Sequence, residues 1–122
     1  MPEHYITKQD ESGSISISED VIGVMVSASV AEVEGVAGLS NTVGTELVEF
    51  LGKRSVTKGI KIVFDEGNVF IDVLIIVRYG YAVTDVAKKV QDEVYSSIES
   101  MTALKAKVNV HVTGIAFDKT AS

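Results

Sequence analysis

The most regular pattern of apolar residues in this chain of 122 residues lies in the segment YGYAVTDVAKKVQDEVYSSIESM, Tyr79–Met101. Its apolar side chains recur at the three- and four-residue intervals of one helix side, at Val83, Val86, Ala87, Val90, Val94, Ile98 and Met101. Charged and polar residues fill most of the positions between them. The segment therefore predicts an amphipathic helix from about Ala82 to Ser100, with one side packed into a core.

Alternating sequences on both sides of this helix predict strands. The preceding segment VFIDVLIIVRY, Val69–Tyr79, has apolar residues at every odd position and a mixed set at the even positions. The following segment alternates from Leu104 to Val112, and Gly114 predicts a bulge or the end of that strand. A third alternating run, Gly59–Phe64, leads into the long strand through the turn DEGN, which predicts a hairpin.

An earlier helix is predicted after the short strand SISI, Ser14–Ile17. Ser18 is a favourable N-cap, and the two residues after it are acidic, which suits the positive end of a helix. The helix should run from Glu19 to about Glu34 and stop at Gly35. Its inward stripe comprises Ile22, Met25, Val26, Ser29 and Val33, whereas Val21, Val24, Ala28 and Ala31 lie off it. A helix with apolar residues on so much of its circumference is expected to be covered on more than one side.

The order of these elements predicts an α+β fold, a two-layer sandwich with a mainly antiparallel sheet and helices on one face. The sequence TELVEFLG adds a short helix between the first helix and the hairpin, so the order is β-α-(α)-β-β-α-β. We expect residues 1–13 to form a disordered N-terminal arm, residues 14–117 a single domain, and residues 118–122 a short C-terminal tail.

Composition excludes several function classes. The chain has no Cys, which removes disulfides, thiol catalysis and thiolate metal sites. Its formal net charge of −6 argues against a sequence-independent nucleic-acid binder and against a protein that binds anionic membranes by itself. The first thirteen residues show no apolar core of a signal peptide, and the run VLIIV, Val73–Val77, is too short to span a bilayer.

Polar residues on the even face of the long strand offer one candidate site. Asp72 and Arg78 lie on that face, and His111 lies on the polar face of the last strand. Together they could form a small-ligand or catalytic site on an open sheet face, although a solvated or subunit-facing surface is the stronger expectation. No nucleophile motif and no metal-ligand spacing accompanies them, so we expect no catalytic residue, no metal and no cofactor.

The sequence GVAG, Gly35–Gly38, allows an alternative interpretation as the GXXG phosphate-binding loop of a KH-like nucleic-acid-binding module. The two central residues are uncharged, and acidic residues flank the loop, so phosphate would be repelled. A simple helix stop and turn is the preferred interpretation, and no nucleic-acid partner is expected.

Two surface features point instead to protein partners. Phe70, Leu74 and Ile76 lie on the even face of the long strand, where one layer of helices cannot cover them, and they predict a self-association surface. A basic cluster of Lys53, Arg54, Lys58 and Lys61 could meet an acidic partner, although a solvated loop is the default.

The chain resembles the alkaline shock protein family of bacterial envelope stress response proteins over about Gly13–Phe117. The resemblance rests on EVEGV at Glu32–Val36, on YG followed by a helix containing VQDEV at Val90–Val94, and on VNVHVTGI at Val108–Ile115. One departure is Ala103, which stands where the family's MTGL element has glycine and which should stiffen the turn into the last strand.

The resemblance implies a small, abundant, non-catalytic cytoplasmic protein of mainly Gram-positive bacteria, linked to cell-envelope stress. It implies self-association into a homo-oligomer and a peripheral position at the inner face of the membrane through a membrane-anchored protein of the same family. It brings no enzymatic activity, cofactor or direct membrane insertion.

Overall fold

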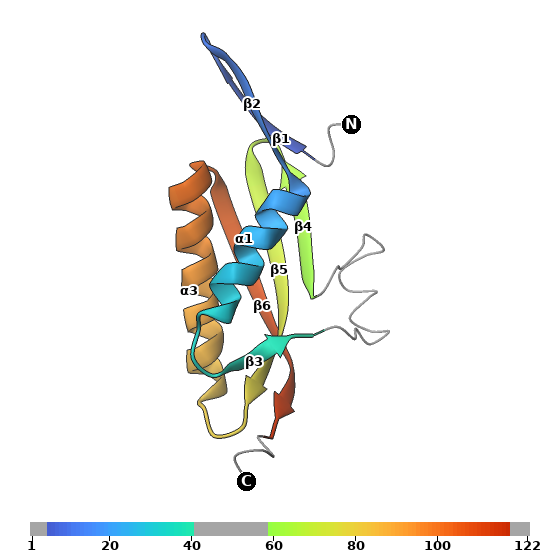
Figure 1. The fold of residues 1–122 in the computed structure, drawn as a ribbon, viewed down its shortest axis with the longest axis vertical. Helices are drawn as coiled ribbons and strands as arrows, with labels where there is room; N and C mark the ends of the chain where they lie inside the picture. The colour runs from blue at the N-terminus through green and yellow to red at the C-terminus, as the bar shows by residue number, and fades with distance from the viewer. Residues whose placement is uncertain (1–4, 41–58, 118–122) are drawn as a thin grey trace.

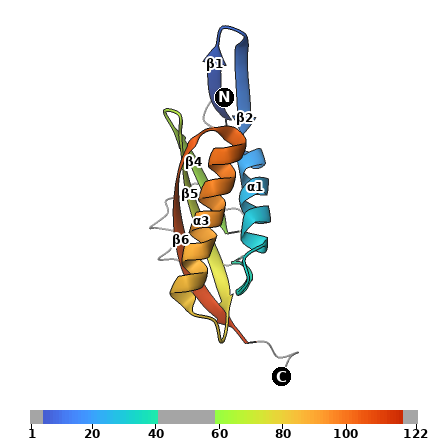
Figure 2. The ribbon, with the colours of Figure 1, turned by 90° about the vertical axis from the view of Figure 1, so that its left-hand side faces the viewer.

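The computed structural model describes residues 5–40 and 59–117, which form a hairpin and a two-layer α+β sandwich. The order is β1 (Tyr5–Asp10), β2 (Gly13–Ser18), α1 (Glu19–Ala31), β3 (Val36–Leu39), β4 (Ile60–Asp65), β5 (Asn68–Arg78), α3 (Val83–Thr102) and β6 (Lys105–Ala116). The two helices lie side by side over one face of the sheet (Figures 1 and 2). This arrangement confirms the predicted fold class.

The sheet is built around the long central strand β5. On one edge, β4 pairs antiparallel with its first half and β3 pairs antiparallel with its second half. On the other edge, β6 runs parallel to β5 along its whole length. A bulge in β6 falls between Val112 and Gly114, where the sequence predicted one.

The strands β3 and β4 meet end to end beside Leu74. The amide of Ser40 donates to the Leu74 carbonyl over 2.9 Å, and the Leu74 amide donates to the Gly59 carbonyl over 2.8 Å. Gly59 has a φ of +82°, and a Cβ added there would lie 2.7 Å from the Ser40 carbonyl oxygen. Only glycine fits this position, so the junction at which the chain leaves and rejoins the sheet edge depends on it.

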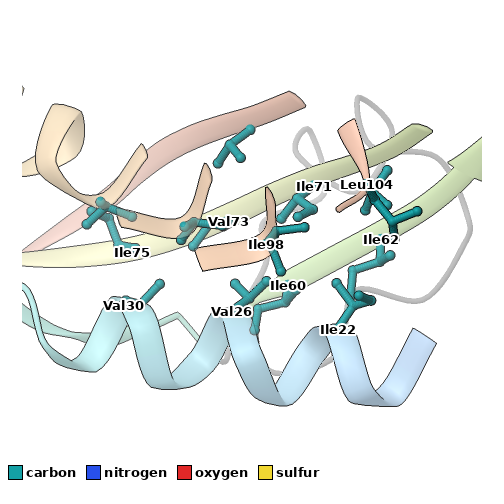
Figure 3. Close-up of a cluster of buried hydrophobic side chains, with 14 of the residues drawn as sticks. Ile22, Val26, Val30, Ile60, Ile62, Ile71, Val73, Ile75, Ile98 and Leu104 are labelled. Carbon is teal, nitrogen blue, oxygen red and sulfur yellow. The ribbon is translucent and has the colours of Figure 1, made fainter. Parts of the chain in front are cut away.

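The core lies between the helices and the sheet (Figure 3). Ile22, Val26 and Val30 of α1 face the strands, as do Val86, Val90, Val94 and Ile98 of α3. Transfer of a Val or Ile side chain of this kind from water contributes about 1.5–3 kcal/mol. The predicted stripe of α3 is therefore confirmed in its centre, whereas its two ends, Val83 and Met101, are exposed.

The predicted cap of α1 is confirmed, because the Ser18 side chain accepts a hydrogen bond from the Val21 amide. The helix ends at Ala31 rather than near Glu34. Val21 and Val24 are exposed, so in a single copy of the chain α1 is covered on one side only.

The N-terminal residues differ from the prediction of a disordered arm. Tyr5–Asp10 form β1, which pairs with β2 in a hairpin that extends beyond the end of the sandwich (Figure 1). The hairpin is held by the pairing of the buried Ile6 with Ile17 and by a turn in which the Asp10 carboxylate accepts from the Ser12 amide. Residues 1–4 lie outside the described part of the chain.

The segment GVAG also differs from the predicted turn. Val36–Leu39 form β3, and their backbone pairs with β5. Val36 and Leu39 pack against the core, which favours a strand over a free loop. The short helix predicted over TELVEFLG falls on residues outside the described ranges.

Candidate functional site on the outer face of the sheet

The face of the sheet opposite the helices carries most of the residues singled out from the sequence, and we call it the outer face. Because side chains alternate along a strand, the even positions of β5 point to it while the odd positions enter the core. The pairing register places Lys61 of β4 beside Asp72, and Asn109 and His111 of β6 beside Asp72 and Leu74.

The polar centre of the outer face is a pair formed by Asp72 and His111. The His111 Nε2 atom lies 3.0 Å from Asp72 Oδ1, and both side chains are largely buried. Since a carboxylate can only accept, the ring nitrogen donates this hydrogen bond. The pair ties β5 to β6, and this contact explains why both polar residues lie on a partly apolar face.

Arg78 does not join this pair. It lies at the end of β5 opposite Ala116, six residues beyond Asp72, which corresponds to roughly 20 Å along a strand. The three-residue site proposed from the sequence is therefore not assembled as one cluster.

The described residues offer little for catalysis at this face. Thr113 Oγ1 donates to the Ile75 carbonyl over 3.3 Å and so has a structural contact. On α3, charge repulsion from Glu99 raises the pKa of the exposed Tyr95 hydroxyl above its usual value. No group of three or more His, Cys, Asp or Glu residues within 5–40 and 59–117 is placed to hold a metal ion.

The three apolar residues predicted as a self-association surface have different exposures. Phe70 and Ile76 are half-buried, whereas Leu74 is 0% exposed. The expectation that Leu74 is exposed is therefore wrong. Its backbone bonds to both Ser40 and Gly59, so it lies at the crowded junction of β3 and β4.

The predicted basic cluster is represented by Lys61, which is half-buried on β4. Lys53, Arg54 and Lys58 lie outside the described residues, and their grouping with Lys61 stays a prediction.

Sequence reasoning missed an apolar patch at the end of the sheet where β5 and β6 finish. Tyr79 follows β5 and Phe117 follows β6, and their rings stack with centroids 4.8 Å apart. Six of the twelve large hydrophobic side chains that are exposed in the described part of the chain belong to the last part of β6, to the residues after β5 and β6, or to the start of α3, and we call them the end patch: Tyr79, Tyr81, Val83, Val112, Ile115 and Phe117. The alternation from Leu104 to Val112 placed Val112 on the same strand face as the buried Leu104 and Val108, and it gave no signal that this end is uncovered.

The edge of β6 is a second feature that the sequence pattern did not reveal. Gln91 Nε2 donates to the Val108 carbonyl over 2.9 Å, and Glu99 Oε2 accepts from the Ala106 amide over 3.3 Å. Both side chains come from the polar side of α3, and their spacing of eight residues is the only signal that pointed to a shared role.

Neither helix of the described ranges is both long and apolar enough to cross a bilayer.

The sequence profile of the alkaline shock protein 23 family, described as having a cell envelope-related function, matches residues 7–117. The chain is 32% identical to the uncharacterized protein YqhY of Bacillus subtilis over 99% of its own length and 93% of that protein. It is 29% identical to the uncharacterized protein YloU of the same organism, over 84% of this chain and 88% of YloU.

Among solved structures, the chain is similar in fold to variants of the MamM C-terminal domain. The H285A variant superposes with a TM-score of 0.51 over 79% of this chain and 96% of that one, at 11% identity. The M250L variant gives the same TM-score. Likeness at such low identity concerns the arrangement of helices and strands.

Proposed function

Because the chain belongs to the alkaline shock protein 23 family, which has a cell envelope-related function, we propose that it is a non-catalytic protein that acts through contacts with copies of itself and with other proteins. Under this proposal the protein catalyses no reaction, and its role depends on the assemblies that it forms.

The observation that carries the proposal is the end patch formed by residues that follow or finish β5 and β6. A soluble protein seldom leaves so many large hydrophobic side chains together on its surface unless a partner covers them. Within this patch the rings of Tyr79 and Phe117 contact each other. Aromatic side chains of this kind supply much of the binding energy of protein interfaces.

The outer face adds a second surface to the proposal. Phe70 and Ile76 present half-buried apolar groups there, beside the half-buried Lys61. Because Leu74 is buried, these two side chains remain the part of the predicted self-association surface that a second copy can reach.

The proposed location is the cytoplasm, with recruitment to the inner face of the membrane by an anchored protein of the same family. The net charge of −6 supports an indirect attachment, because anionic headgroups repel an acidic protein. The exposed side of α1, with Val21 and Val24, offers such a partner an apolar contact.

Light scattering of the purified protein at high micromolar concentration tests self-association. We expect a mass of two copies or more, and a monomer at that concentration would contradict the proposal. A pull-down from membranes and cytosol, with the Val24→Lys variant as a control, tests recruitment. We expect the unmodified chain to retain a membrane protein that the variant loses.

A further inference from the structure

The side of α1 that points away from the sheet is an apolar stripe. It consists of exposed residues that recur at intervals of three and four positions, namely Val21, Val24, Ala28 and Ala31. Residues at these intervals are neighbours on a helix surface, so they form one continuous strip. Val24 is 69% exposed, and the alanines beside it leave the strip low enough for another surface to approach closely. We call it the α1 stripe.

Both ends of the α1 stripe are acidic. Asp20 lies exposed in the first turn of the helix, and the exposed Glu32 and Glu34 follow its last turn. The last turn contains no basic residue, so the negative end of the helix dipole adds to these carboxylates. The whole segment Asp10–Ser40 lacks Lys, Arg and His. A surface that binds the α1 stripe must therefore be apolar in its centre and positively charged at its ends.

The outer face of the sheet has this character. The strand register places four cationic residues on it, namely Lys61, Lys105, Lys107 and Arg78. Phe70 lies opposite Val63 on one side and Lys107 on the other, and Ile76 continues the apolar part toward the end of β5. The carboxylates that the described strands add to this face are Asp65, next to the hairpin turn, and Asp72, which is bonded to His111.

The charges on the two surfaces have similar spacings. Asp20 and Glu32 are twelve residues apart, which corresponds to about 18 Å along a helix. Lys61 lies opposite Asp72, and Arg78 is six positions farther along β5, which corresponds to roughly 20 Å along a strand. One surface thus carries carboxylates at the separation at which the other carries cations, with apolar side chains between them in both.

We propose that the α1 stripe of one copy packs on the outer face of a second copy. Glu32 and Glu34 then face Lys61 and Lys107 of that copy, and Asp20 faces Arg78. This inference rests on the self-association proposed above and names the two surfaces that meet. Charge opposes the symmetric alternatives, because two α1 stripes would bring carboxylates together and two outer faces would bring cations together.

The two surfaces lie on opposite sides of the sandwich, because the helices cover one face of the sheet and the outer face is the other (Figure 2). Two copies therefore cannot make the contact reciprocally. Each copy uses one surface of each kind, so the contact is head-to-tail and can continue from copy to copy. In an open chain of copies, the α1 stripe at one end stays free for the membrane protein of the proposed function.

Mixing two blocked variants tests the inference with the full chain. Val24→Lys places an ammonium in the centre of the α1 stripe, and Ile76→Lys places one in the apolar part of the outer face. Each variant alone should have the mass of one copy in light scattering at a concentration where the unmodified protein associates. Mixed in equal amounts, they should reach the mass of two copies and no more, because each supplies the surface that the other lacks. A mixture that stays monomeric, or a variant that associates alone as well as the unmodified chain, would overturn the inference.

Reversal of two charges gives a test that does not depend on the folding of Ile76→Lys. Glu32 and Lys107 are both exposed, so Glu32→Lys and Lys107→Glu should leave the fold intact. Each change alone should raise the concentration needed for association at least about fivefold, and the double variant should return it to within about twofold of the original. Glu93→Lys and Lys89→Glu make the same charge changes on exposed positions of α3 and should have no effect. A double variant that associates no better than the single ones would overturn the contact as proposed.

The outcomes separate this inference from the proposed function. A monomeric unmodified protein would contradict both. An oligomer whose mass neither Val24→Lys nor Lys107→Glu changes would overturn only the contact between the α1 stripe and the outer face. If Val24→Lys loses a protein recovered from a membrane extract while the mass of the purified protein stays the same, the α1 stripe belongs to that partner and the contact between copies is overturned.

Discussion

Asp72 of β5 and His111 of β6 form a hydrogen bond of 3.0 Å on the face of the sheet that the helices leave uncovered. Such a pair resembles the carboxylate and imidazole of many active sites. Here the described residues place no group of three or more His, Cys, Asp or Glu to hold a metal ion, and the two strands that carry the pair run side by side. Its effect is to hold β6 against β5, so we assign it a structural role.

The first prediction follows from that role. His111→Ala should lower the free energy of unfolding by about 1–3 kcal/mol, because it leaves the largely buried Asp72 carboxylate without its partner. Urea denaturation measures the change. Asn109→Ala, an exposed substitution two residues away on the same face, is the control and should stay within about 0.5 kcal/mol. Equal losses in the two variants would show that the pair contributes nothing specific.

The second prediction concerns the junction of β3 and β4. Gly59 and Gly67 have almost the same φ, +82° and +84°. An added Cβ at Gly59 would meet the backbone of Ser40 and Leu74, whereas nothing lies within 4 Å of one at Gly67. Gly59→Ala should therefore destabilise the fold by more than Gly67→Ala, whose cost is the strain of about 1–2 kcal/mol for a left-handed alanine.

Thermal unfolding of the two alanine variants separates crowding from backbone strain. The excess loss in Gly59→Ala measures how tightly the chain is held where it leaves and rejoins the sheet edge. Equal unfolding temperatures for the two variants would mean that the junction can widen around the added methyl group with little loss of stability.

The third prediction concerns Ala103, which replaces the glycine expected in the alkaline shock protein family. It ends α3 with a φ of 63°, in the left-handed region, and its amide donates to the Glu99 carbonyl over 2.9 Å. Ala103→Gly should raise the free energy of unfolding by about 1 kcal/mol, because it relieves the steric cost of that conformation. Ala87→Gly, within the same helix, should lower it by about 1 kcal/mol. Denaturant titrations of both variants check the opposite signs.

The sequence predicted the elements whose apolar patterns are long and periodic. It failed for short segments, whose structure is decided by packing against the rest of the fold. The spacing from Val86 to Ile98 and the alternation along β5 each give one continuous apolar face. Such a face becomes stable only when it is buried, so the pattern predicts the element. GVAG has the composition of a turn, but Val36 and Leu39 gain more by packing on the core as β3.

The candidate site was predicted less completely than the fold. Alternation placed Asp72 and His111 on the same face, but it could not show that Leu74, between them in the sequence of the strand pair, is fully buried. It also could not show that side chains of α3 reach the edge of β6, because such contacts depend on the position of a helix over a sheet.

The fourth prediction excludes nucleic acid as the partner of Gly35–Gly38. The backbone of Val36–Leu39 is engaged with β5, and Glu32 and Glu34 precede it on the exposed surface. No tight binding to single-stranded RNA is expected at physiological salt, because binding of phosphates depends on cationic groups. Fluorescence anisotropy with a labelled oligonucleotide measures it. A submicromolar affinity that Gly38→Asp abolishes would restore the KH-like interpretation.

The last prediction tests the outer face as a contact between copies. Ile76 is half-buried on β5, and its side chain lies close to Gly114 of β6. In Ile76→Lys, the long stem can follow the apolar surface while the ammonium reaches water, so the single copy should stay folded. If a second copy covers this face, the buried charge would weaken self-association, and light scattering should show a smaller mass at the same concentration.

Val63→Lys, at a half-buried position of the neighbouring strand β4, tests how far the contact extends. An unchanged mass in both variants would exclude the outer face from the assembly and leave the end patch as the surface to pursue. Unfolding of Ile76→Lys, seen by circular dichroism, would show instead that Ile76 serves the fold of a single copy.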